Sequence, residues 1–393
     1  MQPTTINARA LAKSGMEALQ KGDAQGARAA FEQIINADQA DASICLALAY
    51  ACRVLKDRNA MIAAVDKTLA LEQGNLRALI MKADYLHKLG DARGAAAYYV
   101  AVVKAAAAFE TLPPDVRDDV VQAQAMADRY ALQFDSFLRT QLLEHGLHDG
   151  PSAQRFKQSL DILAGGKQRY IQEPRIYFFP ELAQIQFFDR SDFPWLTPVE
   201  AETAAIRAEL IEIMKEDAAF KPYVQPNPNR PNQNQAGMVN NADWGAFYLW
   251  KDGEIVTENA VRCPHTMRAL ADVPFARVPG RSPSVLFSLL RPGAHIPPHN
   301  GFVNTRLICH LPLIVPDGCR FRVGNEVRQW VEGKAWLFDD TIEHEAWNDS
   351  KDVRVILLFE IWRPELTTEE RSLVSAMFES IDAHRGKKTE WGI

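Results

Sequence analysis

The stretch HIPPHNGFVNTRLICH (295–310), followed by FDDTIEHEAW (338–347), decides the fold of the C-terminal half of this chain. His299 and His344 each lie at the edge of a β-type run, and Arg354 lies inside the next one. A cation inside a packed sheet needs an anionic partner, and neutral imidazoles are preferred ligands for divalent iron, copper or zinc. Two imidazoles and an anion-binding arginine therefore predict a metal site that also holds an acidic cosubstrate, as in a non-haem iron oxygenase.

Around these residues the chain reads as many short strands with tight turns. The runs are AFYLW, SVLFSLL, TRLICHLPL, CRFRV, KAWLFDD and VRVILLFEIW. Such a series predicts a jelly-roll barrel. Alternation along the strands places Arg306, Ile308 and His310 on one face, opposite a purely apolar face. Because Ile308 shares the polar face, we expect a barrel interior, where Ser288, His310 and Arg354 converge on a carboxylate.

The first hundred residues repeat every 34 positions. The same inter-helix turn recurs as Gly-Asp at 22–23, Lys-Asp at 56–57 and Gly-Asp at 90–91. Small residues recur in register at Gly15, Ala49 and Ala83, and large ones at Phe31, Val65 and Tyr99. This pattern resembles tetratricopeptide repeats at 8–41, 42–75 and 76–109. The concave face of such a stack often binds a peptide or protein, and a docking or dimerisation spacer is an equal alternative.

These patterns predict a multidomain α + β chain with three parts. Tetratricopeptide-like repeats occupy 1–110, a capping or linker helix 111–150, and a β-rich catalytic domain 151–393. Capping boxes predict helices that begin at Thr197-x-x-Glu200 and Thr367-x-x-Glu370. The Pro- and Asn-rich segment 225–241 is either a solvated loop or a flap over the site.

Composition excludes several classes. The chain has 393 residues, 47% of them hydrophobic, and a net charge of −6, which gives no support to nucleic-acid binding. No apolar run approaches the length that a membrane span needs, and MQPTTINARALAKSG lacks a signal-peptide core, so we expect a cytoplasmic protein. Five scattered cysteines without a CxxC predict buried thiols and no cysteine zinc site.

The first histidine lacks two features of common metal motifs. His295 and His299 are four residues apart, but two intervening prolines exclude a regular helix and no HExxH is present. Facial-triad oxygenases place a carboxylate two residues after the first histidine, whereas Gly301 occupies that position. The missing carboxylate at position 301 therefore counts against a facial triad of two histidines and one carboxylate.

The segments HNGFVNTRLICHLPL, GKAWLFDDTIEHEAWND and VRVILLFEIWRPEL resemble the core of the aspartyl/asparaginyl β-hydroxylase family, and the resemblance covers roughly 175–366. It implies a double-stranded β-helix and an Fe(II)-, 2-oxoglutarate- and O₂-dependent hydroxylase, which releases succinate and CO₂. It also implies iron bound by only two histidines, His299 and His344. Gly301 then leaves the third position to a water, which Asp340 holds.

The resemblance assigns further roles. Arg354 and Ser288 match the residues that bind the distal carboxylate of 2-oxoglutarate, and His310 lies near its metal-chelating end. Arg306 is the expected substrate-binding residue. Ile308 departs from the family, which often has a second arginine there, so substrate recognition is altered.

The leading hypothesis is hydroxylation of an Asp/Asn-type or related side chain in a protein or peptide that the repeats recruit. Alternatives are the same chemistry on a small molecule or lipid, a catalytically silent repeat-containing adaptor, and a cupin-like metal enzyme without 2-oxoglutarate. Retention of His299, His344 and Arg354 together counts against the adaptor.

Overall fold

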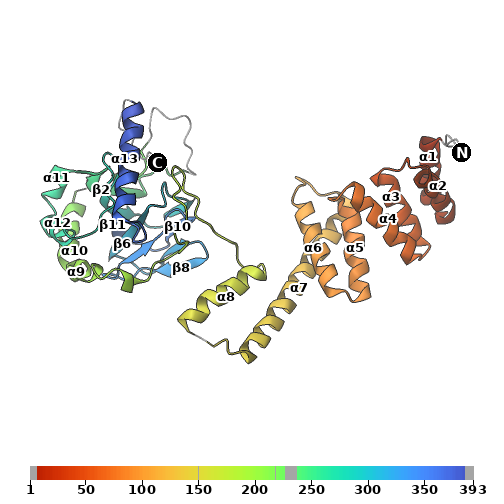
Figure 1. The fold of residues 1–393 in the computed structure, drawn as a ribbon, viewed down its shortest axis with the longest axis horizontal. Coiled ribbons are helices and arrows are strands. Elements are labelled where there is room, and N and C mark those ends of the chain that lie inside the picture. Colours follow the sequence, from red (N-terminus) through yellow and green to blue (C-terminus); the bar gives the residue numbers. More distant parts are fainter. Residues whose placement is uncertain (1–6, 149, 217, 226–236, 386–393) are drawn as a thin grey trace. The chain divides into compact units, whose positions relative to one another are not determined.

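The computed structural model describes residues 7–148, 150–216, 218–225 and 237–385. These residues form two compact units, Met1–Lys167 and Gln168–Ile393 (Figure 1). The boundary between the two units lies after Lys167, whereas the catalytic domain was expected to begin at residue 151. Helix α8 (Pro151–Leu163) therefore groups with the repeat unit.

The first unit is a series of antiparallel helix pairs. Its three pairs are α1 (Ala8–Gln20) with α2 (Ala24–Asn36), α3 (Ala42–Val54) with α4 (Arg58–Leu71), and α5 (Leu76–Leu89) with α6 (Ala92–Ala106). One pair falls within each predicted 34-residue repeat, so the predicted helical repeats are confirmed. Gly15 lies against the ring of Phe31, so the small and large positions of the repeat meet.

The recurring turn has a simple physical cause. Its aspartates, Asp23, Asp57 and Asp91, are the N-caps of α2, α4 and α6, and each accepts a hydrogen bond from a backbone N–H three residues later. Such a cap satisfies one of the free N–H groups at a helix start. The turn motif therefore marks where the second helix of each pair begins.

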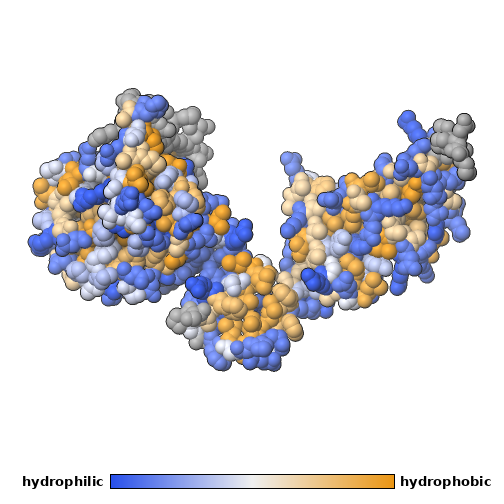
Figure 2. All heavy atoms as spheres, in the orientation of Figure 1, coloured by the Kyte–Doolittle hydropathy of each residue, from blue (hydrophilic) through white to orange (hydrophobic). Residues whose placement is uncertain are grey.

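A long helix follows the repeats. The short helix η1 (Pro114–Val116) leads into α7 (Arg117–Glu144), which packs on α6 and lies within the segment 111–150. Apolar side chains lie exposed on α7 and α8, including Leu132, Phe137 and Phe156 (Figure 2). Among the described residues, no helix is both long enough and apolar enough to cross a membrane.

The second unit contains two antiparallel sheets. The larger has the strand order β1-β2-β4-β11-β6-β9, with β3 paired to β2, and the smaller has the order β5-β10-β7-β8. The strand bounds are β1 Lys221–Pro222, β2 Trp244–Lys251, β3 Glu254–Ile255, β4 Val285–Leu290, β5 His295–His299, β6 Arg306–Ile314, β7 Cys319–Val323, β8 Glu326–Gln329, β9 Trp336–Phe338, β10 His344–Asn348 and β11 Arg354–Trp362. From β4 to β11 the chain crosses repeatedly between the sheets, which is the interleaved order of a double-stranded β-helix.

Two apolar layers lie on opposite faces of the larger sheet. One contains Phe287, Leu307 and Leu357 and packs against helices outside the sheet. The other contains Ile308 and Phe321 and fills the space between the two sheets. Strand alternation therefore assigned the two faces correctly, because side chains of period two cannot change face without a register slip.

Helices cover the outer face of the larger sheet. They are η2 (Arg190–Asp192), α9 (Leu196–Ala201), α10 (Thr203–Met214), α11 (Thr257–Ala260) and α12 (Pro264–Ala269), and α13 (Thr368–Arg385) follows the last strand. The capping box at α13 is confirmed, because Thr367 and Glu370 exchange hydrogen bonds between side chain and backbone. The box predicted at Thr197 is wrong, since Thr197 lies inside α9 and that helix has no side-chain cap.

The predicted loop or flap at 225–241 falls largely outside the described residues. Only Gln225 and 237–241 belong to the described part of this segment.

Candidate active site

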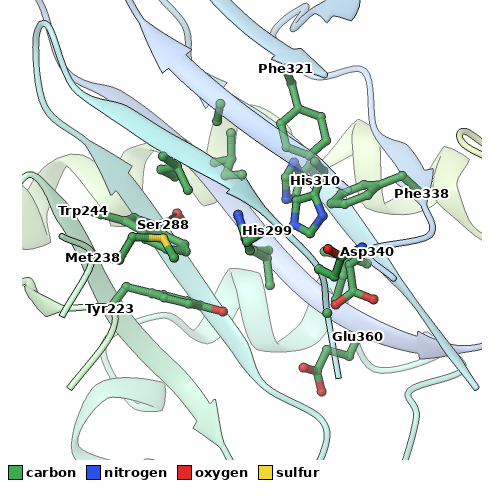
Figure 3. Close-up of a pocket in the computed structure, with 18 of the residues that line it drawn as sticks. Tyr223, Met238, Trp244, Ser288, His299, His310, Phe321, Phe338, Asp340 and Glu360 are labelled. Atoms are coloured by element: carbon green, nitrogen blue, oxygen red, sulfur yellow. Dashed lines mark hydrogen bonds between the residues drawn. The ribbon is translucent and has the colours of Figure 1, made fainter. Parts of the chain in front are cut away.

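A pocket opens between the two sheets (Figure 3). It is lined by all seven residues singled out in the sequence: Ser288, His299, Arg306, His310, Asp340, His344 and Arg354. They come from β4, β5, β6, β10, β11 and the turn after β9. The sequence spacing alone did not require these strands to meet, so the pocket is a product of the interleaved topology.

His299 and His344 face each other across neighbouring strands. They are cross-strand partners on β5 and β10, and their ring centroids are 4.1 Å apart. Nδ1 of His299 lies 2.8 Å from the carbonyl oxygen of Pro297, and Nδ1 of His344 lies 3.1 Å from that of Ile342. A carbonyl only accepts, so each Nδ1 carries the proton and each Nε2 keeps its lone pair.

Both imidazoles are held neutral. Burial and, to a smaller extent, the adjacent His344 lower the pKa of His299 to about 3. Burial likewise lowers the pKa of His344 to about 4. Neutral rings with free Nε2 atoms are the form of histidine that binds a divalent metal. Within the described residues, no group of three or more His, Cys, Asp or Glu side chains is arranged for a metal ion.

Arg354 is a buried cation without a carboxylate partner among the described residues. Its side chain is 1% exposed, its Nε has no hydrogen-bond partner there, and Nη1 lies 3.5 Å from the backbone oxygen of Ser288. The guanidinium lies over the ring of Trp330, 4.9 Å from its centroid. Burial lowers the pKa of Arg354 to about 10. An uncompensated cation in such a position creates strong attraction for an anion.

Ser288 and His310 lie on the same wall of the pocket as Arg354. The Ser288 hydroxyl accepts a hydrogen bond of 3.2 Å from the indole N–H of Trp244. His310 is 5% exposed, its Nδ1 has no partner in the described part of the chain, and it is surrounded by aromatic rings. Burial and the nearby Arg354 lower the pKa of His310 well below the ordinary value. Arg354 Nε and His310 Nδ1 are thus buried polar atoms without partners among the described residues, which is typical of a site for a polar ligand and unusual in an apolar core.

At the other end of the pocket, Arg306 is shared by two carboxylates. Its Nη2 donates to Asp340 Oδ2 at 3.2 Å, and its Nη1 contacts Glu360 Oε1. Burial raises the pKa of Asp340, an effect that Arg306 opposes. The remaining oxygen, Asp340 Oδ1, is buried and has no partner among the described residues. Gly301 lies against this carboxylate, so any side chain at 301 would overlap it.

Sequence reasoning missed several residues of the site. Trp330 under Arg354, and Tyr223 and Trp244 in the pocket wall, carried no recognisable motif. Tyr223 and Trp244 stack with centroids 4.1 Å apart. Because aromatic residues serve cores and pockets equally well, only the fold distinguishes the two roles. His295 lies outside this pocket, where it contacts Glu345 at 2.9 Å.

The fold and the site define a double-stranded β-helix protein with a neutral histidine pair and a cation open to an anionic ligand. Residues 200–364 match the model of the aspartyl/asparaginyl beta-hydroxylase family. This part of the chain is therefore similar to that hydroxylase family, and the domain follows a set of helical repeats.

Curated relatives agree with this assignment. The mouse aspartyl/asparaginyl beta-hydroxylase is 41% identical over 138 residues, which are 34% of this chain and 18% of that protein. The ornithine lipid ester-linked acyl 2-hydroxylase of Rhizobium tropici is 33% identical over 47% of this chain and 63% of that protein. The matched part of the chain thus spans less than two thirds of these relatives' lengths.

Solved structures also resemble the helical part. PcrH in complex with the chaperone binding region of PopD is 20% identical over 34% of this chain and 98% of that chain, with a TM-score of 0.29. The TPR2B-domain:pHsp70 complex of yeast Sti1 gives 19% identity over 33% of this chain and 99% of that chain, with a TM-score of 0.28. The repeat architecture described above rests on the helices themselves.

Proposed function

We propose that the second unit is an Fe(II)- and 2-oxoglutarate-dependent dioxygenase that hydroxylates a C–H bond of a protein or peptide side chain. The single observation that carries this proposal is the pairing of two neutral, facing histidines with an uncompensated buried arginine in one pocket. The family assignment supports hydroxylation in general, and the chemistry of these residues supports the particular cofactors.

His299 and His344 are the proposed iron ligands. Their Nδ1 protons are tied to backbone carbonyls, so both rings are fixed and both Nε2 atoms are free. Such hydrogen bonds orient a ligating histidine and raise its basicity. Asp340 Oδ1, which is unpartnered among the described residues, fits the role of acceptor for a water on the metal. When bound, Fe(II) with 2-oxoglutarate and O₂ supplies the oxidising chemistry for the C–H bond.

Arg354 and Ser288 are the proposed partners of the distal carboxylate of 2-oxoglutarate. A guanidinium binds a carboxylate through paired N–H donors, and the Arg354 Nε lacks a partner until a ligand arrives. His310 fits the end of the cosubstrate that chelates metal, because its buried Nδ1 also lacks a partner in the described residues. The aromatic rings around it exclude water and strengthen these contacts.

The helical repeats are proposed to recruit the target. Stacked helix pairs present an extended face on which peptides dock, and O₂ enters as the second substrate. A second candidate is the same chemistry on a lipid, which the 33% identity to the ornithine lipid ester-linked acyl 2-hydroxylase favours. The two candidates share the metal and cosubstrate residues and differ only in the substrate.

Anaerobic titration of the Fe(II)-loaded full chain with 2-oxoglutarate tests the site. We expect a visible metal-to-ligand charge-transfer band that disappears in His344→Ala and needs far more cosubstrate in Arg354→Ala. His295→Ala is the matched control, because this histidine lies outside the pocket. A wild-type protein that holds iron but gives no band on titration contradicts the 2-oxoglutarate assignment. A band unchanged in His344→Ala contradicts the ligand assignment.

A further inference from the structure

The end of the pocket that holds Arg306 carries more negative than positive groups. Arg306 on β6, Glu360 on β11 and Asp340 are each at most 6% exposed, and all three line the pocket. Figure 3 shows Asp340 and Glu360 at the same end. We call these three residues with Ile308 the substrate compartment, because the proposed cosubstrate residues lie at the other end of the pocket.

Arg306 already contacts both carboxylates, those of Asp340 and Glu360. One guanidinium nitrogen donates to Asp340 and the other contacts Glu360, whose second oxygen accepts from the backbone N–H of Ser284 at 3.0 Å. A cation that is shared by two buried carboxylates has no excess charge for a third. Arg306 is therefore a poor receptor for an acidic substrate, although its position in the strand suggested that role.

A second cation at position 308 could also bind a carboxylate here, but this chain has Ile308 at that position. It lies on the same face of β6 as Arg306 and His310, its side chain is 6% exposed, and its backbone pairs with Glu360. An isoleucine offers no donor and lowers the local polarity. A carboxylate beside Ile308 would lose its hydration and lie near two like charges.

Arg175 is a further cation among the residues that line the pocket. Arg175 is exposed and its guanidinium lies over the ring of Phe302, 5.4 Å from the centroid. Water and salt screen an exposed charge much more than a buried one. Arg175 therefore does not offset the carboxylates of the interior.

We propose that the substrate group entering this compartment is a hydrogen-bond donor without negative charge, such as a carboxamide or an ammonium group, and that a carboxylate is rejected. This inference rests on the proposed function, because it takes the wall of Arg354 and Ser288 as the cosubstrate side. It deepens that function by excluding acidic side chains as substrates. Asp340 and Glu360 act as specificity residues through their charge.

The test uses the full chain loaded with Mn(II) in place of Fe(II) and with N-oxalylglycine as an unreactive 2-oxoglutarate analogue. Three matched probes are added separately: the N-acetyl, N-methylamide derivatives of asparagine, aspartate and 2,3-diaminopropionate. Paramagnetic relaxation of the probe's side-chain protons measures how often it lies near the metal. In wild type we expect the asparagine and diaminopropionate probes to be relaxed about tenfold more than the aspartate probe.

Two substitutions make the test specific. Ile308→Arg adds a second cation and offsets the excess negative charge of this compartment, so we expect it to raise the relaxation of the aspartate probe at least to that of the asparagine probe. Glu360→Gln is nearly isosteric and removes one negative charge, so we expect it to narrow the difference in relaxation between the asparagine and aspartate probes. This variant keeps the test valid if Ile308→Arg does not fold. Ile255→Arg is the control, because residue 255 is 51% exposed on β3, outside the pocket lining.

Equal or greater relaxation of the aspartate probe in wild type overturns the inference. The inference is also overturned if the order of relaxation among the probes is unchanged both in folded Ile308→Arg and in Glu360→Gln. It is overturned as well if no probe is relaxed in either wild type or Ile308→Arg. Binding of Mn(II) and N-oxalylglycine is measured separately by electron paramagnetic resonance. Loss of that binding would signal failure of the proposed function, whereas retained binding with a wrong probe order signals failure of the charge argument alone.

Discussion

The carboxylate of Asp340 occupies the space into which any side chain at Gly301 would extend. Position 301 is where a facial-triad oxygenase carries its carboxylate ligand. Gly301 is not at positive φ, so packing against Asp340 rather than backbone conformation explains the glycine. Gly301 and Asp340 therefore depend on each other, because the glycine leaves the space that the Asp340 carboxylate occupies beside the pocket.

Gly301→Ala should destabilise the second unit by about 1–3 kcal/mol, because overpacking a rigid interior strains its neighbours. Asp340→Gly removes the clash but also a partner of Arg306, so the double variant should lose clearly less stability than the sum of the two single losses. Urea unfolding followed by tryptophan fluorescence is the appropriate measurement. All eight tryptophans lie at or beyond Trp195, so the signal reports the second unit alone. Additive losses would show that the two residues do not compete for space.

Arg354→Met should stabilise the ligand-free protein. Burial lowers the pKa of Arg354, which means that the folded state disfavours this charge. An apolar side chain of similar length removes that penalty, and we expect a gain of about 1–2 kcal/mol in the free energy of unfolding. The stabilisation that wild type gains from 2-oxoglutarate should vanish. Arg320→Met, at a side chain 43% exposed, is the control and should leave both quantities nearly unchanged. A less stable Arg354→Met would mean that the cation is compensated in the free protein.

The metal-free protein should lose stability as the pH falls below about 6.5, the ordinary histidine value. The pKa values of His299 and His344 are lowered to about 3 and about 4, so between 6.5 and these values only the unfolded chain takes up the protons. The free energy of unfolding therefore falls with decreasing pH, by at most about 1.4 kcal/mol per pH unit for each histidine. The double His299→Asn, His344→Asn variant should show a flatter pH profile by chemical denaturation. An unchanged slope would indicate that the two rings titrate normally in the folded state.

Asp339→Asn should be far more damaging than a change in an exposed pair. Arg363 and Asp339 are both fully buried and 2.7 Å apart, and Asp339 also accepts from Gln172 at 2.6 Å. Removing one charge leaves Arg363 short of a buried partner, which costs about 3–5 kcal/mol. Limited proteolysis should then cut near Gln172. Glu326→Gln, in a pair that is 33–37% exposed, should cost less than about 1 kcal/mol. Similar losses in both variants would refute the structural importance of the Asp339 pair.

Much of the fold follows from local pattern. The 34-residue period gave the helix pairs, because each Asp of the repeated turn caps a helix. Alternation along β6 separated Leu307 from Arg306 correctly, since side-chain direction in a strand has a fixed period. The capping box at Thr367 succeeded for the same local reason. The one at Thr197 failed because that residue lies inside a short helix that begins at Leu196.

The sequence by itself determined the repeats, the faces of the strands, and the identity of the histidines and arginine that carry the proposed chemistry. Only the tertiary structure decided which distant residues meet. Arg306 is shared by Asp340 and Glu360, whereas Arg354 lies over Trp330 with no acid beside it in the described part of the chain. This difference depends on the order in which the strands cross between the two sheets. The free energy of a buried charge is set by its neighbours in space, and sequence periodicity carries no information about those neighbours.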